Sequence, residues 1–255
     1  KWTTDINVSL YKDKVTDYYL SSMRGSNFVS NHAQPNIAGK AGKPVYSIFS
    51  YRWAGLDPAT GNPQGYFEGQ INNDYTSITG NATSIDDLIY HGPALPTLFG
   101  SAGNTFAWNN LSLSARVSYK LGYFFRRESI YYSSLFAGSG HSDYSLRWQK
   151  PGDETSTSVP SMVYPSPANR DAFYNGSEIM VEKGDHIRLQ YITVSYDLQK
   201  EHFRRLPFKV LQIYTNASDL GVLWTANKKG IDPEYRRFSN LIPSKTISFG
   251  LRGTF

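Results

Sequence analysis

The C-terminal stretch Lys245–Phe255 reads KTISFGLRGTF and alternates between two kinds of side chain. Ile247, Phe249, Leu251 and Phe255 are apolar, and the residues between them are mostly small or polar. Because a β-strand sends successive side chains to opposite faces, this pattern predicts a strand with one apolar and one polar face. In a soluble protein the apolar face would pack on a core. In an outer-membrane barrel it would face lipid, and the polar face would line the lumen.

The longest alternation in the chain covers residues 111–123. Apolar side chains occupy every odd position from Leu111 to Tyr123, and the even positions hold Ser, Arg, Lys or Gly. Such a run indicates a strand. Arg116 and Lys120 on its polar face argue against a dry core, because unpaired buried charges are costly. A water-filled lumen removes that cost, so the pattern favours a barrel.

The composition narrows the classes of protein. The 255 residues carry a formal net charge of +5, and their Lys and Arg residues are scattered, which disfavours nucleic acid as a partner. The chain has no cysteine, which excludes disulfides and thiolate metal sites. No stretch approaches the roughly 18 consecutive apolar residues of a transmembrane helix, whereas barrel strands need only about 9–11 residues. Interfacial girdles or sugar-stacking surfaces would explain the 15% aromatic content.

Alternating or extended patterns predict about seven strands in an all-β, antiparallel transmembrane barrel. They lie at residues 2–10, 43–56, 96–108, 111–123, 185–198, 207–215 and 243–255. The apolar phase of the strand at 185–198 changes near Tyr191, which predicts either a bulge there or an upper part that packs inward beyond the lipid.

The connections between these strands alternate between short and long from Asn109 onward, as a meandering barrel requires. With Phe255 placed at the periplasmic side, the short connections at 109–110 and 199–206 are periplasmic, and so is the one at 12–42. The long connections at 57–95, 127–182 and 219–242 are then extracellular. Long loops without secondary structure are uncommon in compact soluble domains.

Four further stretches carry a resemblance to a known family. They read YRWAGLDP at 51–58, RWQKPGDE at 147–154, GDHIRLQ at 184–190 and GIDPE at 230–234. Their order and spacing resemble the SusC/RagA family of TonB-dependent outer-membrane transporters of Bacteroidota. The resemblance implies that residues 1–255 are the C-terminal part of a plugged barrel of about 22 strands. Because Lys1 reads as the middle of a strand, we expect the plug domain and the earlier strands to lie outside this chain.

The resemblance also implies a function. Such a transporter imports an oligomeric nutrient across the outer membrane of a Gram-negative bacterium, with energy from TonB. A glycan is the favoured cargo and a peptide the alternative. The family implies a SusD-like surface lipoprotein over the external loops, contact with lipid and lipopolysaccharide, no bond chemistry and no redox cofactor.

Two other functions remain open at this point. One is a secreted carbohydrate-binding β-sandwich, which the high aromatic content would also suit. The length of the loop at 127–182 and the charges of Arg116 and Lys120 count against it. The other is a passive porin-like channel, which the strand pattern alone does not exclude.

The sequence offers no persuasive catalytic or metal site. The five histidines lack a metal-ligand spacing such as HxxxH. Asp153 and Glu154 would be a carboxylate pair for glycoside chemistry, but adjacent acids on a Pro-Gly turn are more typical of a solvated loop or a loop-ordering salt bridge. Asp232 and Glu234 flank Pro233, and such a sequence is usually a turn, although it would also suit a cation or a partner.

Three sets of residues are candidates for binding or recognition. Tyr144, Arg147 and Trp148 suit the stacking and forked hydrogen bonds of a glycan or peptide site, although loop packing is the favoured interpretation. Arg126 and Arg127 follow three aromatic residues and would either pair with lipopolysaccharide phosphates or form an ordinary surface pair. In the family, the apolar residues of the last strand are the barrel-assembly signal. These are Phe249, Leu251 and Phe255.

Overall fold

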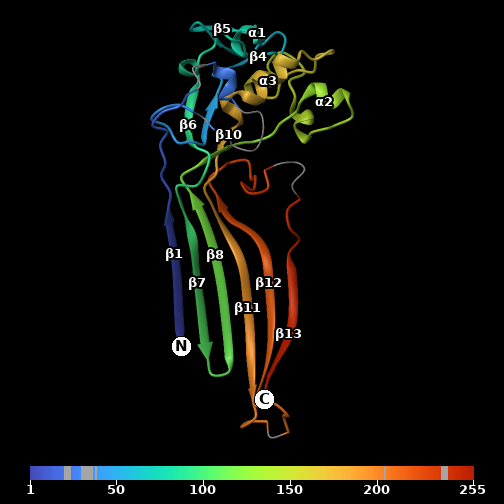
Figure 1. The fold of residues 1–255 in the computed structure, drawn as a ribbon. Coiled ribbons are helices and arrows are strands. Elements are labelled where there is room, and N and C mark those ends of the chain that lie inside the picture. The colour runs from blue at the N-terminus through green and yellow to red at the C-terminus, as the bar shows by residue number, and fades with distance from the viewer. Residues whose placement is uncertain (20–23, 30–36, 38, 204, 237–240) are drawn as a thin grey trace.

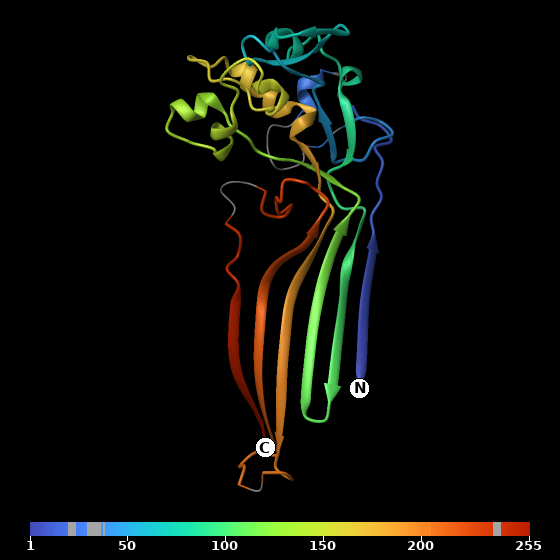
Figure 2. The ribbon, with the colours of Figure 1, turned by 180° about the vertical axis from the view of Figure 1, so that it is seen from behind.

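The computed structural model describes residues 1–255 with the exception of residues 20–23, 30–36, 38, 204 and 237–240. A tall, curved antiparallel sheet carries a compact folded unit at one end (Figure 1). The described residues within 11–97 and 122–185 make up this unit, which we call the end unit. Seen from behind, the sheet is an open wall below the end unit (Figure 2).

Six long strands form the sheet, in the order β1-β7-β8-β11-β12-β13, and all neighbours are antiparallel. They are β1 (Trp2–Leu10), β7 (Leu98–Trp108), β8 (Leu111–Leu121), β11 (His186–Gln199), β12 (Val210–Thr225) and β13 (Thr246–Thr254). Within the described residues, β1 pairs only with β7 and β13 only with β12, so both are edge strands. The expected all-β antiparallel architecture is present, and the sheet is not closed by itself.

The register places apolar residues from neighbouring strands in rows on one face of the sheet. One row runs from Phe106 through Leu113 and Val194 to Thr215 and Phe249. The large apolar members of this row are exposed, and Phe249 is 80% exposed. An extended exposed apolar face of this kind marks a surface that contacts something other than water. The alternations at 111–121 and 246–254 are therefore confirmed as two-faced strands.

The opposite face of the sheet is polar, and it carries an ion pair that spans three neighbouring strands. Arg116 on β8 forms an ion pair with Asp5 on β1. The same guanidinium donates to Ser101 Oγ at 3.2 Å and to Tyr191 Oη at 3.3 Å. The side chain of Arg116 remains partly exposed. Its charge therefore lies on a polar surface and not in a dry core, as the sequence predicts.

A bulge at Gln190 explains the change of apolar phase in β11. The register of β11 with both β8 and β12 shifts between Leu189 and Tyr191, so Gln190 is the extra residue. Its Nε2 donates to Ser118 Oγ on the polar face at 2.5 Å. The extra residue keeps Leu189 and Ile192 on the same apolar face, and the bulge interpretation is confirmed.

The expected strand at 43–56 does not join the long sheet. Its residues form two short strands in small sheets, β2 (Ser47–Ser50) paired with β6 (Ile89–Pro93), and β3 (Trp53–Leu56) paired with β4 (Pro63–Phe67). Phe49 and Tyr51 are buried there. An extended aromatic pattern fits a short buried strand as well as a membrane strand, so the pattern alone did not separate the two.

The prediction that residues 12–42 connect strands at the C-terminal end of the sheet is wrong. Leu10, the last residue of β1, pairs with Leu98 at the end of the sheet that carries the end unit. Thr254 pairs with Val210 at the other end. The described residues of 12–42 belong to the end unit, and parts of this connection lie outside the described residues.

Strand β12 is also longer than the sequence predicts. The strand expected to end at Thr215 continues to Thr225. Asp219 and Gly221 have positive φ angles of 55° and 96°. Such residues are strong turn signals, but here they are local irregularities inside a continuing strand. The connection to β13 therefore begins at residue 226 instead of residue 219.

The end unit is folded throughout its described residues, including most of the segment 127–182 that was expected to be a long loop. It also contains β5 (Gln70–Asn72), β9 (Phe124–Arg126), β10 (Val181–Lys183), α1 (Tyr75–Ile78), α2 (Tyr132–Phe136), α3 (Ala168–Gly176) and the short 3-10 helices η1 (Gly25–Asn27), η2 (Ile85–Asp87), η3 (Ser142–Leu146), η4 (Asp153–Thr155) and η5 (Glu178–Met180). None of the helices in the described part of the chain is long and apolar enough to span a membrane.

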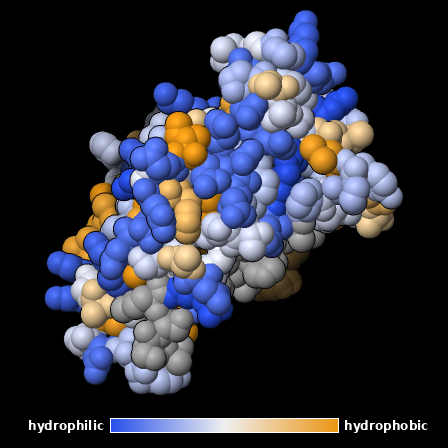
Figure 3. Space-filling model, turned by 90° about the horizontal axis from the view of Figure 1, so that it is seen from above, coloured by the Kyte–Doolittle hydropathy of each residue, from blue (hydrophilic) through white to orange (hydrophobic). Residues whose placement is uncertain are grey.

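Aromatic packing around α3 holds the end unit together. The ring of Phe173 is fully buried and lies 5.9 Å from Tyr51, 5.8 Å from Tyr75 and 6.2 Å from Trp53, centroid to centroid. Rings at these separations stabilise a core beyond the burial of their area. Seen from above, the molecule is mostly hydrophilic, with scattered hydrophobic residues (Figure 3).

Candidate substrate-binding pocket

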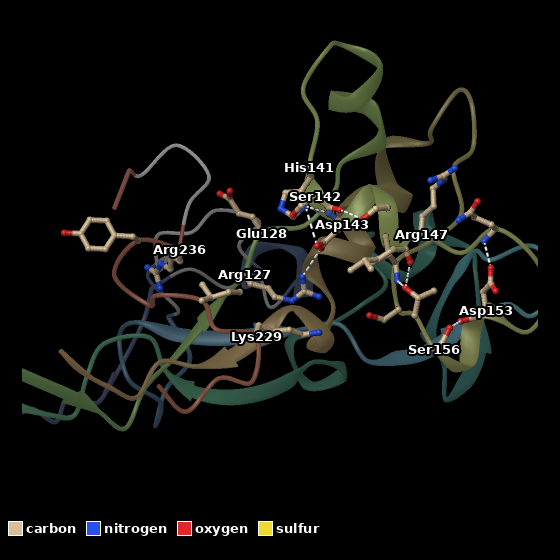
Figure 4. Close-up of a pocket in the computed structure, with 18 residues that line it drawn as sticks. Arg127, Glu128, His141, Ser142, Asp143, Arg147, Asp153, Ser156, Lys229 and Arg236 are labelled. Carbon is tan, nitrogen blue, oxygen red and sulfur yellow. Dashed lines mark hydrogen bonds and ion pairs between the residues drawn. The ribbon is translucent and has the colours of Figure 1, made fainter. Parts of the chain in front are cut away.

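A pocket of about 730 Å³ lies between the end unit and the connection from β12 to β13. Figure 4 shows the residues that line it. One wall comes from η3, η4 and the segment 156–159, and the other from the connection at 229–236. Arg127, directly after β9, lies between the two walls. A pocket of this size falls within the range of ordinary ligand sites.

Arg127 joins β9 to η3. Its backbone N–H donates to Met180 O at 2.8 Å, and its Nη1 donates to Asp143 Oδ2 at 3.2 Å. Ser129 Oγ donates to the same carboxylate oxygen at 2.5 Å. Glu182 Oε1 lies 4.0 Å from Arg127 Nε. The charge of Arg127 is therefore compensated by two acids, and its role in the structure is to hold the wall of the pocket.

The three aromatic and basic residues predicted for substrate binding do not act together. Only Arg147 lines the pocket. Tyr144 packs against the buried cluster around Tyr132, and its ring lies 4.0 Å from the guanidinium carbon of Arg147. Trp148 is 8% exposed, and a Cβ at Gly61 would come within 2.4 Å of its ring. The geometry favours loop packing for Tyr144 and Trp148.

The adjacent acids of η4 serve the loop that carries Trp148. Asp153 Oδ2 accepts the backbone N–H groups of Gln149 and Lys150, both at 3.0 Å. Glu154 Oε2 accepts Gly152 N–H at 2.8 Å and Trp148 Nε1–H at 3.1 Å. Backbone hydrogen bonds at the start of η4, followed by the indole, lower the pKa of Glu154. This is the loop-ordering role that the sequence favours for the pair.

Ion pairs hold the second wall of the pocket to the polar face of the sheet. Arg188 Nη2 donates to both carboxylate oxygens of Asp232 at 2.6 Å, and Arg188 Nε lies 2.9 Å from Glu234 Oε2. Lys120 also pairs with Glu234, and His186 Nε2 lies 3.8 Å from Glu234 Oε1. We call these five residues the latch. Its acids come from the turn-like Asp232-Pro233-Glu234 motif, and the sequence did not reveal their partners on β8 and β11.

The latch lowers the pKa of Glu234 to about 2. The contact with His186 is the first cause, and Lys120 and Arg188 act in the same direction, whereas partial burial opposes them. The carboxylate is thus charged at every ordinary pH. Folding lowers the pKa of this carboxyl group. The ionised group therefore stabilises the latch at pH values above the pKa of the unfolded chain, and this contribution is lost as the pH falls toward 2.

Arg126 and Arg127 are both buried, which favours a structural role over contact with lipopolysaccharide phosphates. Arg126 is 6% exposed and donates to the carbonyl oxygens of Phe49 at 2.5 Å and of Asn175 and Ser177 at 3.1 Å. Burial lowers its pKa to about 10, so it stays protonated near neutral pH. The sequence suggested an exposed end of a strand, but β9 lies inside the end unit, and both arginines are structural.

A buried Ser–His pair lies near Arg126. Ser50 Oγ and His91 Nε2 are 2.6 Å apart, and Ser50 is fully buried. Burial, with Arg126 nearby, lowers the pKa of His91 to about 4, so the imidazole is neutral at pH 7. A hydroxyl without solvent access has no route to a substrate, and the pair is part of the packing. Among the described residues, no group of three or more His, Cys, Asp or Glu side chains is placed to hold a metal ion.

The apolar residues of the last strand lie on the apolar face of the sheet. Leu251 pairs with Ile213 on β12, and Phe255 packs its ring 4.9 Å from that of Phe208. Phe249, Leu251 and Phe255 are all exposed. Recognition by an assembly machinery remains a prediction for these three residues.

Neither a protein-family model nor a curated protein matches this chain, whereas solved structures do. The RagAB peptide importer in its closed-closed state matches with a TM-score of 0.63 and 19% identity, over 97% of this chain and 26% of that chain. Its open-open state matches with a TM-score of 0.57 and 22% identity, over 84% of this chain and 23% of that chain. A RagAB peptide transporter structure matches with a TM-score of 0.52 and 22% identity, over 80% of this chain and 22% of that chain.

At these identities the likeness concerns the fold. The chain spans about a quarter of the length of the solved chains that it matches. Its fold is therefore similar to that of one part of those chains.

Proposed function

We propose that this chain is the C-terminal wall segment of a TonB-dependent transporter in the outer membrane of a Gram-negative bacterium. The observation that carries the proposal is the sheet, in which an exposed apolar face backs a polar face that carries the Arg116–Asp5 ion pair. This is the arrangement of a wall between lipid and an aqueous lumen. The fold shared with RagAB importer chains over 97% of this chain supports the same function.

The two edges of the sheet support a larger barrel. Unpaired backbone groups in lipid cost several kcal/mol each, so an open sheet is not a stable wall by itself. We propose that strands outside this chain pair with β1 and β13 and close a barrel of about 22 strands. The end unit then faces the cell exterior, and the residues of the last strand, Phe249, Leu251 and Phe255, carry the assembly signal.

The cargo that we propose is a peptide. The solved neighbours are a peptide importer, and the pocket beside η3 is lined mostly by charged and hydroxyl groups, with Tyr235 as the one tyrosine among the described residues that line it. This replaces the glycan that the sequence favoured, because Trp148 is buried and unavailable for stacking on sugar. By the family resemblance, a SusD-like lipoprotein covers the end unit, and TonB acts through the plug.

Two measurements test this function. The first is the denatured mass of the polypeptide that carries this C-terminus in purified outer membranes. A mass well above 28.7 kDa is expected, and a lone 28.7 kDa species in the soluble fraction would instead support the secreted sandwich. The second is peptide uptake with and without TonB. Uptake should be lost without TonB, and uptake that persists would point to a passive channel.

A further inference from the structure

We propose that the pocket beside η3 binds the carboxylate groups of an extended acidic oligomer, with Arg147 and Lys229 as its two cationic contacts. The proposal rests on the import function above and narrows its cargo. Figure 4 shows Arg147 and Lys229 at separate positions around the pocket, one on each wall. Two separated cations suit a ligand that carries more than one carboxylate.

The acids of the pocket are largely committed to its own walls. Asp143 accepts hydrogen bonds from Arg127 and Ser129. Asp153, the first residue of η4, accepts the backbone N–H groups of Gln149 and Lys150. These two carboxylates therefore do not compensate Arg147 or Lys229.

Arg147 and Lys229 form no ion pair with any residue in the part of the chain that the structure describes. Arg147 is held over the ring of Tyr144 and donates from Nη1 to Tyr144 O at 3.0 Å. A guanidinium has five N–H donors in a planar fork, so most of them remain available to a carboxylate. Lys229 is exposed and offers three further donors.

Hydroxyl groups line the pocket together with these cations. Ser142, Ser145, Ser156, Thr157 and Ser158 all take part. Ser145 Oγ donates to Ser142 O at 2.9 Å, and Ser156 Oγ donates to Asp153 O at 3.0 Å. Because Ser145 and Ser156 use their hydroxyl hydrogen atoms within the wall, their oxygens can act only as acceptors toward a ligand, which suits the N–H groups of a peptide or the hydroxyls of a sugar acid.

Hydrogen bonds within the segment 227–231 and the latch directly after it hold the backbone at Lys229. Asn227 Nδ2 donates to Ile231 O at 2.8 Å, and Ile231 N–H donates back to Asn227 Oδ1 at 3.0 Å. Lys229 lies at the centre of this tight loop, and Asp232 directly after it is bound to Arg188. The loop that carries Lys229 is therefore ordered before a ligand binds, which lowers the part of the entropic cost of binding that comes from ordering the backbone.

The test uses the purified intact transporter with all its chains. The probes are a fluorescein-labelled hexapeptide of alternating Glu and Ser, the matched peptide with Gln for Glu, the matched peptide with Lys for Glu, and a labelled oligogalacturonate of similar length. We expect the Glu peptide to bind at least tenfold more tightly than the Gln peptide, and raised salt to remove most of this difference.

Variants assign the effect to the two cations. Lys229→Ser and Arg147→Gln should each weaken binding of the Glu peptide about five- to tenfold and leave the Gln peptide unchanged. Lys228→Ser is the matched control, because Lys228 is adjacent and exposed but does not line this pocket. Lys229→Arg should retain tight binding. The comparison of Lys229→Arg with Lys229→Ser tests the proposal even if the Arg147 variant disturbs the packing on Tyr144.

The outcomes separate this proposal from the import function. Tighter binding of the Glu peptide or of oligogalacturonate supports the carboxylate site, and the preference between them identifies the source of the carboxylate. Equal binding of the Glu, Gln and Lys peptides, or equal losses in Lys228→Ser and Lys229→Ser, overturns the carboxylate site. If TonB-dependent uptake of the Gln peptide persists in that case, the import function stands alone.

Discussion

The long sheet and the end unit place the same types of side chain in opposite environments. In the end unit, Phe173 is fully buried within an aromatic core, whereas Phe249 on the sheet is 80% exposed. Charges differ in the same way. Arg126 is enclosed among backbone carbonyl oxygens, whereas Arg116 pairs with Asp5 across a polar surface. The end unit packs its aromatic side chains around a buried core, whereas the sheet leaves an apolar face and a polar face exposed on opposite sides.

The largest loss of stability is expected from a change at Arg126 in the end unit. Arg126→Met removes the guanidinium that donates to three buried carbonyl oxygens, and we expect it to destabilise the end unit by about 3–5 kcal/mol. Of the three, Ser177 O keeps the backbone N–H of Met180 as a donor at 3.2 Å. Denaturant-dependent proteolysis of the intact protein measures the change. Lys150→Met, at an exposed position of the same unit, serves as the control. A loss below about 1 kcal/mol at Arg126 would show that the buried guanidinium is not structural.

The next effect separates the two faces of the sheet. Val194 lies on the apolar face and Ser195 on the polar face of the same strand. Under the proposed function, Val194→Lys places a charge in lipid and should cost about 2–4 kcal/mol near the middle of the bilayer. Ser195→Lys faces the lumen and should cost little. The yield of folded protein in outer membranes measures both, and equal yields would contradict the assignment of faces.

The smallest effect is expected at the latch that joins the two regions. Glu234→Gln removes a carboxylate bound by Lys120 and Arg188, and we expect a loss of about 1 kcal/mol after screening by solvent. Hydrogen exchange of the amides at 226–236 measures it. In the wild type the protection should fall as the pH drops from about 4.5 toward 2. In Glu234→Gln it should vary less with pH over that range, and Glu201→Gln should behave as the wild type.

The sequence predicts the sheet well because successive side chains of a strand point to opposite faces, so an apolar face appears in the sequence as an alternation with a period of two residues. Residues 111–121 and 246–254 form strands with the predicted faces, and the phase change near Tyr191 is explained by the bulge at Gln190. The predicted end at Thr215 fails, because turn-favouring residues such as Asp219 and Gly221 are accommodated within a long strand.

The end unit was not predictable in the same way, because contacts distant in sequence form it. Arg126 looks like an exposed residue at a strand end, and only the return of Asn175 and Ser177 encloses it. The acids at 232 and 234 look like a turn, and their partners lie more than forty residues away. The candidate pocket combines segments that the chain brings together only on folding, so Arg147 could be singled out by its chemistry but Lys229 could not.

The most direct test of the central claim is cysteine labelling along β8, since the chain has no cysteine of its own. Single cysteines at Leu113, Ser114, Val117 and Ser118 of the intact protein in outer membranes would be treated with a lipid-soluble and a water-soluble maleimide. We expect the lipid-soluble reagent to label positions 113 and 117 and the water-soluble reagent to label positions 114 and 118. Labelling of 113 and 117 by the water-soluble reagent, or protection of both positions from both reagents, would contradict a lipid-facing wall.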